Sequence, residues 1–115
     1  MQFFNDSVHA AANLNETINV TKGVFEGSAK TILDWSKTSS TSVLLSRTAA
    51  LQAASGFGAL FNQAVGVGEQ SVKMSQGMVQ LAADLASVYN IPVDDALERI
   101  KSGLIGEAEP LRRLN

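Results

Sequence analysis

The sequence contains no cysteine, a single histidine (His9) and only two prolines in 115 residues. Without thiols the chain cannot form disulfides, thiolate nucleophiles or thiolate zinc sites, so its stability must come from the burial of apolar side chains. Because there is one histidine, any metal site would depend on carboxylates alone. We therefore expect neither a metal nor another cofactor.

Charge is also scarce: 9 Lys and Arg face 11 Asp and Glu, and charged residues make up only 17% of the chain. Since nucleic-acid binding relies on a basic excess that displaces counterions from phosphates, we expect no specific nucleic-acid partner. The start Met1–Asp6 has no basic residue before an apolar run, so we expect no secretory signal. With 45% apolar residues, the chain has enough apolar surface to fold.

The apolar residues follow a helical period, most clearly between Glu69 and Tyr89. One continuous stripe has spacings of four, three, four and three residues and consists of Met74, Met78, Leu81, Leu85 and Val88. A second stripe lies beside it and consists of Val79, Ala82, Ala86 and Tyr89. A buried arc of this width indicates a helix packed against two neighbours. The helix is predicted to end at Asn90-Ile91-Pro92, because the residue before proline is pushed out of the α region.

Pro92 favours the first turn of a next helix, where Asp94 and Asp95 complement the positive end of the helix dipole. The predicted inner face of this helix consists of Val93, Ala96, Leu97, Ile100 and Leu104. Gly103 or Gly106 is expected to close it in a left-handed conformation. A separate last turn from Glu107 to Leu114 is expected to follow, with Leu111 and Leu114 inward and Arg112 and Arg113 outward.

The first half of the chain gives weaker signals. Residues 39–42 indicate a polar turn whose hydroxyls cap a helix beginning near Val43 and running toward Val65. A helix of about three turns is predicted from Phe25 to Lys37, whereas residues 6–21 are only partly helical in spacing. No strand pair with a tight Asn-Gly or Asp-Gly turn is present. We predict an all-α fold: a single domain over residues 1–115, a compact bundle of five or six helices with short connections.

The stretch from Thr48 to Gly68 contains no charged residue and has about the ~20 residues that a helix needs to cross a bilayer. Its apolar content is mostly Ala and Gly, so insertion into a membrane is expected to be weak. The favoured reading is a packed helix in which Ala50, Ala54 and Gly58, four residues apart, let another backbone approach closely. Phe57 and Phe61 are then expected to fill the core beyond that contact.

No group of residues is placed for catalysis, so we do not expect an enzyme. Gly56-Phe57-Gly58 and Gly66-Val67-Gly68 each show the first two glycines of a dinucleotide fingerprint but lack the third. Asp94 and Asp95 would point about 100° apart on a helix, which favours a dipole-capping role over shared chemistry. The remaining candidates, His9 and the pair Arg112 and Arg113, are interpreted as solvated surface residues.

Three blocks in the second half of the chain closely resemble a segment of the tail tape measure proteins of long-tailed bacteriophages. They are QLAADLASVYN (residues 80–90), VDDALERIKSGL (residues 93–104) and GEAEPLRR (residues 106–113). The upstream phrases SGFGALF (residues 55–61) and MSQ (residues 74–76) resemble the helix that precedes this segment in the same family. The resemblance covers residues 31–114.

The resemblance implies a structural role. Tape measure proteins act as rulers that set the length of the tail tube, are coated by chaperones in the host cytoplasm, lie inside the tail and leave ahead of the DNA at infection. Family members are usually several times longer, so this chain is expected to be an excised or truncated piece. A fully helical chain of this length would reach only ~170 Å.

The expected function is therefore that of a non-catalytic helical segment whose partners are other tail proteins or assembly chaperones. The expected packing surfaces are the stripe from Met74 to Val88 together with Leu97, Ile100 and Leu104. Any part of that stripe left uncovered is expected to drive self-association. Two alternatives remain: a membrane-active segment at Thr48–Gly68 that aids genome delivery, and a cell-wall hydrolase for which Asp84 is the nearest candidate acid.

Overall fold

The computed structural model describes the backbone of residues 2–114 and the side chains of residues 13–106. All regular structure in this part of the chain is helical. The elements in order are α1 (Gln2–Phe25), a 3-10 helix η1 (Glu26–Ser28), α2 (Ala29–Ser36), α3 (Ser39–Ser42), α4 (Arg47–Val65), α5 (Glu69–Tyr89) and α6 (Val93–Leu114). The prediction of an all-α bundle with short connections is confirmed.

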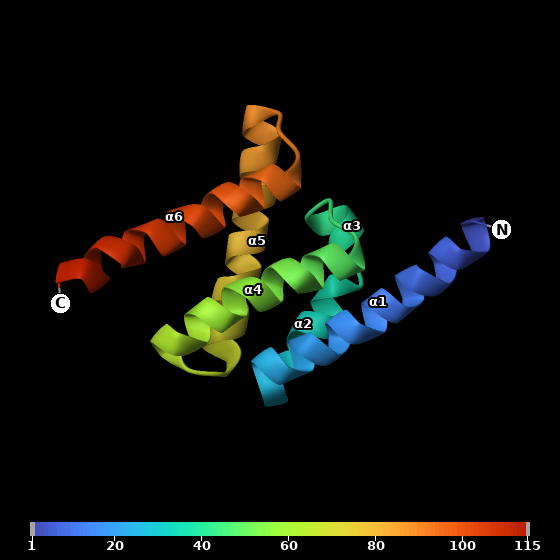
Figure 1. Cartoon of the computed structure of the whole chain (residues 1–115), viewed down its shortest axis with the longest axis horizontal. Coiled ribbons are helices and arrows are strands. Elements are labelled where there is room, and N and C mark those ends of the chain that lie inside the picture. The colour runs from blue at the N-terminus through green and yellow to red at the C-terminus, as the bar shows by residue number, and fades with distance from the viewer. Residues whose placement is uncertain (1, 115) are drawn as a thin grey trace.

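Helix α4 lies at the centre of the bundle, where it packs most extensively against α5 and α1 (Figure 1). Helices α1, α4 and α6 cross the view in the same general direction, and α5 passes behind α4 and α6 (Figure 1). The N-terminal end of α1 and the C-terminal end of α6 point to opposite sides of the body. These two ends account for a longest dimension of 55 Å against 36 and 23 Å in the other directions.

The main core contains side chains from α1, α2, α4, α5 and the loop before α4. Its largest fully buried apolar members are Phe25, Ile32, Val43, Leu51, Val72 and Val79. A second, smaller cluster joins α5 to α6 through Ala82, Ala86 and Ala96. Because alanines bring the two helices close together, α6 is held against α5 by short side chains, with the half-buried Leu97 and Ile100 packed on both clusters.

Helix α1 is continuous from Gln2 to Phe25, although the apolar spacing of residues 6–21 is only partly helical. Its polar residues are accommodated because their hydroxyls bond within the helix: Thr17 Oγ1 donates to the Asn13 carbonyl at 2.7 Å and Thr21 Oγ1 donates to the Thr17 carbonyl at 2.9 Å. The predicted helix from Phe25 to Lys37 is interrupted at its start. Glu26 adopts a φ of 50°, and η1 separates α1 from α2.

The start of α4 also differs from the prediction. Residues 39–42 form the single helical turn α3, and α4 begins only at Arg47, capped by Ser46, whose Oγ accepts the Ala49 N–H at 3.2 Å. Val43 and Leu45 both enter the core, so the intervening Leu44 faces solvent with a φ of 58°. The three apolar residues therefore form a loop that anchors α3, where the sequence pattern predicted the first turn of a helix.

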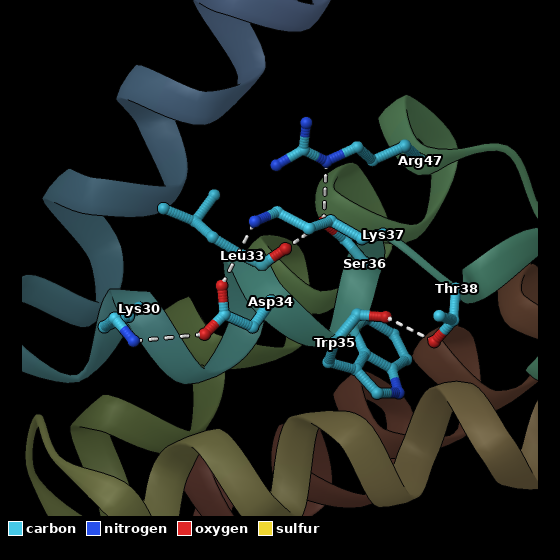
Figure 2. A network of polar contacts seen from close by, with 8 residues as sticks. All are labelled: Lys30, Leu33, Asp34, Trp35, Ser36, Lys37, Thr38 and Arg47. Carbon is cyan, nitrogen blue, oxygen red and sulfur yellow. Dashed lines mark hydrogen bonds and ion pairs between the residues drawn. The ribbon is translucent and has the colours of Figure 1, made fainter.

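A polar junction fixes α2 against the first residue of α4. Arg47 Nε donates to Ser36 Oγ at 3.0 Å, and Ser36 Oγ in turn donates to the Leu33 carbonyl at 2.7 Å (Figure 2). Ser36 is almost fully buried. The junction thus satisfies a buried hydroxyl and holds the beginning of α4 over the end of α2.

The boundaries of α5 match the prediction. Asn90 closes the helix in a left-handed conformation, with φ 54° and ψ 48°, and its N–H bonds to the Ala86 carbonyl. The Pro92 carbonyl accepts the N–H groups of Asp95 at 3.1 Å and Ala96 at 3.2 Å, which places Pro92 immediately before α6 as expected. At the other end, Gly66 with a φ of 82° allows the short turn between α4 and α5.

Helix α6 passes through both glycines that were predicted to close it. Neither Gly103 nor Gly106 has a positive φ, and α6 runs without a break to Leu114. Glycine permits a left-handed closing conformation but does not require one, so the helical hydrogen bonding continues through both positions. The predicted closing residue and separate last turn are therefore wrong, while the expected inward and outward side chains from Leu111 to Leu114 lie outside the described side chains.

Candidate interaction surface

The predicted packing residues of α4 form part of the core. Ala50, Ala54, Phe57 and Gly58 are buried and Phe61 is half-buried, with the Phe57 and Phe61 rings stacked at a centroid distance of 6.3 Å. The close approach at Gly58 is made by the side chains of Phe25 and Val24 on α1, where a helix backbone was expected. This set of residues stabilises the bundle.

The buried face of α5 is not the one that the sequence predicted as the principal face. It consists of Ser71, Val72, Ser75, Val79, Ala82, Ala83 and Ala86. This face includes most of the second predicted stripe and is rotated by roughly a third of a turn from the first. Small residues occupy this face because they let α4 and α6 approach α5 closely. The Ser75 hydroxyl donates a hydrogen bond to the Ser71 carbonyl at 2.8 Å.

The first stripe, named here the α5 stripe (Met74, Met78, Leu81, Leu85 and Val88), is only partly covered by the chain. Met78 packs against the main core and Leu85 against the second cluster. In contrast, Leu81 is 41% exposed and Val88 is 75% exposed, and the adjoining Tyr89 is 68% exposed. Within the chain the stripe is thus covered at Met78 and Leu85, while Leu81, Val88 and the adjoining Tyr89 form an exposed apolar strip.

The exposed strip has one charged neighbour on α5. The charged residues of this helix are Glu69, Lys73 and Asp84, all exposed. Asp84 lies three residues after Leu81 and four before Val88, so it borders the strip on one side. Gly77, one turn before Leu81, is exposed and has open space at the position of a Cβ. An uncovered apolar strip on a helix has the chemistry of a helix-docking surface.

The predicted packing residues of α6 hold that helix on the bundle. Leu97, Ile100 and Leu104 are half-buried, and all three pack against the main core. Further along α6 the side chain of Ile105 is exposed. Asp94 and Asp95 occupy the first turn of the helix, as expected from its dipole.

Two grooves beside α4 were not anticipated. A groove of about 420 Å³ between α1 and α4 includes Val20 and Ser55, and one of about 280 Å³ between α4 and α6 includes Leu97. Gln52 and Gly56 line both grooves, so the two grooves adjoin along this part of α4. The grooves could not be predicted from the sequence, because each lies between helices that are distant in the chain. The only sequence feature that pointed to them was the lack of charge between Thr48 and Gly68.

The other candidate residues are not brought together. Gly56-Phe57-Gly58 lies inside α4 and Gly66-Val67-Gly68 links α4 to α5, so neither follows a strand. Within residues 2–114 no helix is both long and apolar enough to cross a membrane. Among the described residues no cluster of three or more His, Asp or Glu could hold a metal ion. The side chains of His9, Arg112 and Arg113 lie outside those described.

The comparisons with known proteins give no match: no family model, no curated protein and no solved structure is significantly similar to the chain.

Proposed function

We propose that the chain is a non-catalytic helical segment of a tape measure protein from a long-tailed bacteriophage or prophage. In this role it acts through helix–helix contacts with tail proteins or assembly chaperones. The proposal is supported by the resemblance of residues 80–113 and by one structural observation: the exposed apolar residues Leu81, Val88 and Tyr89 fall within that same segment.

The energetics favour a partner on this surface. Burial of apolar area contributes roughly 25 cal/mol per Å², and Leu81 and Val88 gain only part of it within the chain. Anchors at positions i, i+4 and i+7 of one helix are the pattern by which helices dock into apolar grooves. Leu81, Leu85 and Val88 have this spacing.

The dimensions show that the chain could be only a small part of a ruler. The folded chain is 55 Å in its longest direction, compared with ~170 Å for the same number of residues in one straight helix. As part of a tape measure protein it would lie inside the tail of the virion, after residing in the host cytoplasm during assembly. Its contribution to tail length would depend on how far its helices extend in series.

The test is an in-frame deletion and a tandem duplication of residues 69–114 in a phage genome that encodes this sequence. If the segment is part of the ruler in helical form, tails seen by electron microscopy should shorten or lengthen by up to ~1.5 Å per residue changed. The duplication serves as the second variant, because a deletion can also block assembly. Tails of unchanged length in both variants would contradict the proposal, as would the absence of its peptides from purified virions by mass spectrometry.

Flotation of the isolated chain with liposomes tests the membrane alternative. The proposed function predicts that the chain stays with the soluble fraction. Flotation that resists high salt, and is abolished when Phe57 and Phe61 on α4 are replaced by Ser, would instead support membrane activity through Thr48–Gly68.

A further inference from the structure

Helix α4 forms the floor of the two adjoining grooves. It lies between α1 and α6 (Figure 1), and the groove beside α1 has a volume of about 420 Å³ and the one beside α6 about 280 Å³. The boundary between them consists of the flexible side chain of Gln52 and of Gly56, which has none. Because a cavity of about 150 Å³ already holds a benzene-sized group, each groove can take a large apolar side chain of a partner.

The lining of the grooves suits a packed helix. Beside α1 its largest exposed apolar side chain is Val20, which is 54% exposed. Beside α6 it includes the half-buried Leu97 together with Ala49 and Ala53. Residues 48–65 of α4 carry no charge. A floor of small uncharged residues lets the backbone of another helix approach closely, as it does where a helix binds in an apolar groove.

The charged residues that line the grooves are acidic on both outer walls. Glu16 lies on the α1 side, Asp94 and Glu98 lie on the α6 side, and all three are exposed. The one cation in the lining is Lys101, whose Nζ would lie 3.7 Å from a Cβ on Gly56. None of these four groups forms an ion pair with another described side chain. Three carboxylates against one ammonium give this surface a negative potential, which a cationic partner complements.

From these observations we propose that the two grooves bind a basic amphipathic helix of another protein, which lies across α4 at Gln52 and Gly56. Helix α4 is ~10 Å wide with its side chains, so apolar residues seven apart in the partner, ~10.5 Å along its axis, enter the two grooves. Lys and Arg residues beyond these anchors then reach Glu16 on one side and Asp94 and Glu98 on the other. This inference is independent of the α5 stripe and of the proposed role in a phage tail.

Binding is measured with a fluorescent peptide of roughly 18 residues, long enough to form a helix, with leucine on one face and lysine on the rest. The same peptide with glutamate in place of lysine should bind at least tenfold more weakly. Amide NMR shifts during the titration should centre on Val20, Gln52, Gly56 and Leu97. No binding of the lysine peptide, equal affinity for the glutamate peptide, or shifts centred on the α5 stripe would overturn the proposal.

The variant Gly56→Leu tests the boundary between the grooves. A Cβ at Gly56 makes only an ordinary contact with the end of the flexible Lys101 side chain, so the fold is kept while the leucine fills the space that the partner would use. The affinity for the lysine peptide should fall at least tenfold, with unchanged circular dichroism. Gly77→Leu is the matched control, because Gly77 is an exposed glycine inside α5 with open space at the position of a Cβ. Equal affinities of the two variants would refute the site.

Charge substitutions test the acidic walls. Glu16→Lys and Glu98→Lys should each weaken binding several-fold at low salt, and Lys101→Gln should strengthen it, because each changes the charge that faces the partner. Glu69→Lys on α5 makes the same change in net charge outside the lining of the grooves and is the control. An equal loss of affinity in Glu69→Lys and Glu98→Lys would mean that only the overall charge matters, and the proposal would be wrong.

Two other occupants are distinguished by the same NMR measurement without the peptide. If the groove residues shift when the chain alone is concentrated, the occupant is a second copy. If they shift on addition of phosphatidylcholine vesicles, it is a lipid surface. Either result contradicts the proposal and leaves the outcome of the tail-length experiment unaffected.

Discussion

The ring of Phe25 lies directly against Gly58, so that a Cβ on Gly58 would come within 2.7 Å of Phe25 Cε1 and 2.9 Å of Val24 Cγ1. Phe25 is fully buried, so its ring can move away only by displacing other core residues. Overpacking of this kind typically costs about 1–3 kcal/mol, more than the roughly 1 kcal/mol that Ala gains over Gly in a helix. Gly58→Ala should therefore lower the free energy of unfolding, measured by urea denaturation.

Gly103→Ala is the matched control for this prediction. Gly103 also lies inside a helix, but it is exposed and has no group within 4 Å of the position of a Cβ. The same substitution there should leave stability unchanged or raise it by up to about 1 kcal/mol. If Gly58→Ala proved as stable as Gly103→Ala, the close packing of α1 on α4 would be refuted.

A buried pair of hydroxyls links the same two helices. Thr21 Oγ1 lies 3.0 Å from Ser55 Oγ and also bonds to the Thr17 carbonyl. Because the single proton of Thr21 goes to that carbonyl, Ser55 is the donor in the pair. Thr21→Val leaves the Ser55 hydroxyl without an acceptor and should cost roughly 1–3 kcal/mol, whereas Ser55→Ala should cost less, about 1 kcal/mol.

A double-mutant cycle separates the pair from its surroundings. With both substitutions present, the loss of stability should be smaller than the sum of the single losses by ~1 kcal/mol. Additive losses would mean that the two hydroxyls do not interact in solution.

Helix α5 shows how much of the fold the sequence could predict. Its boundaries followed from a long periodic segment and a proline signal, and both were correct. Its buried face was misjudged because Val79 is flanked by Ser71, Ser75 and alanines, whose small size matters for packing but contributes little hydrophobicity. Which face of a helix is covered depends on how closely its neighbours can approach, and that is a property of the assembled bundle.

The prediction that the helix begins near Val43 was wrong for a related reason. Val43, Leu44 and Leu45 are continuous with the apolar pattern of the helix that follows, so local spacing assigned them to it. Tertiary packing instead draws Val43 and Leu45 into the core and leaves Leu44 in the left-handed region. The exposure of Leu81 and Val88 could not be predicted from the sequence either. Residue type alone does not distinguish an apolar stripe that the chain covers from one that stays exposed.

The carboxylate of Asp34 has a pKa below its ordinary value of 3.8, because Lys30 bonds to it and attracts its charge, with a smaller contribution from Lys37 (Figure 2). The ion pairs are 3.4 and 3.5 Å long and exposed to solvent. A group whose pKa is lowered by folding stabilises the native state above its unfolded pKa, and this contribution is lost as the pH falls through the folded pKa. The effect is therefore full at neutral pH, begins to fade near the ordinary pKa of 3.8 and is gone only below the lowered pKa of the folded chain.

Titration of Asp34 by NMR is the direct measurement of this shift. Lys30→Gln should raise the pKa of Asp34 more than Lys37→Gln, and high salt should reduce both differences because the pairs are exposed. Asp34→Asn should remove this part of the pH dependence of unfolding. An Asp34 pKa at or above the ordinary value in the wild-type chain would show that the pairs do not form.

Substitutions at two valines on α5 test which face of the helix contributes to the stability of the fold. Val79 is fully buried in the main core and Val88 is 75% exposed, although both belong to predicted apolar stripes. Val79→Ala removes buried methyl groups and leaves a cavity, so it should cost roughly 2 kcal/mol of unfolding free energy. Val88→Ala should change it by less than about 0.5 kcal/mol when measured at a concentration at which the chain is monomeric. Equal losses at the two positions would mean that the second half of the α5 stripe is covered within a single chain, and the surface proposed for partners would not exist.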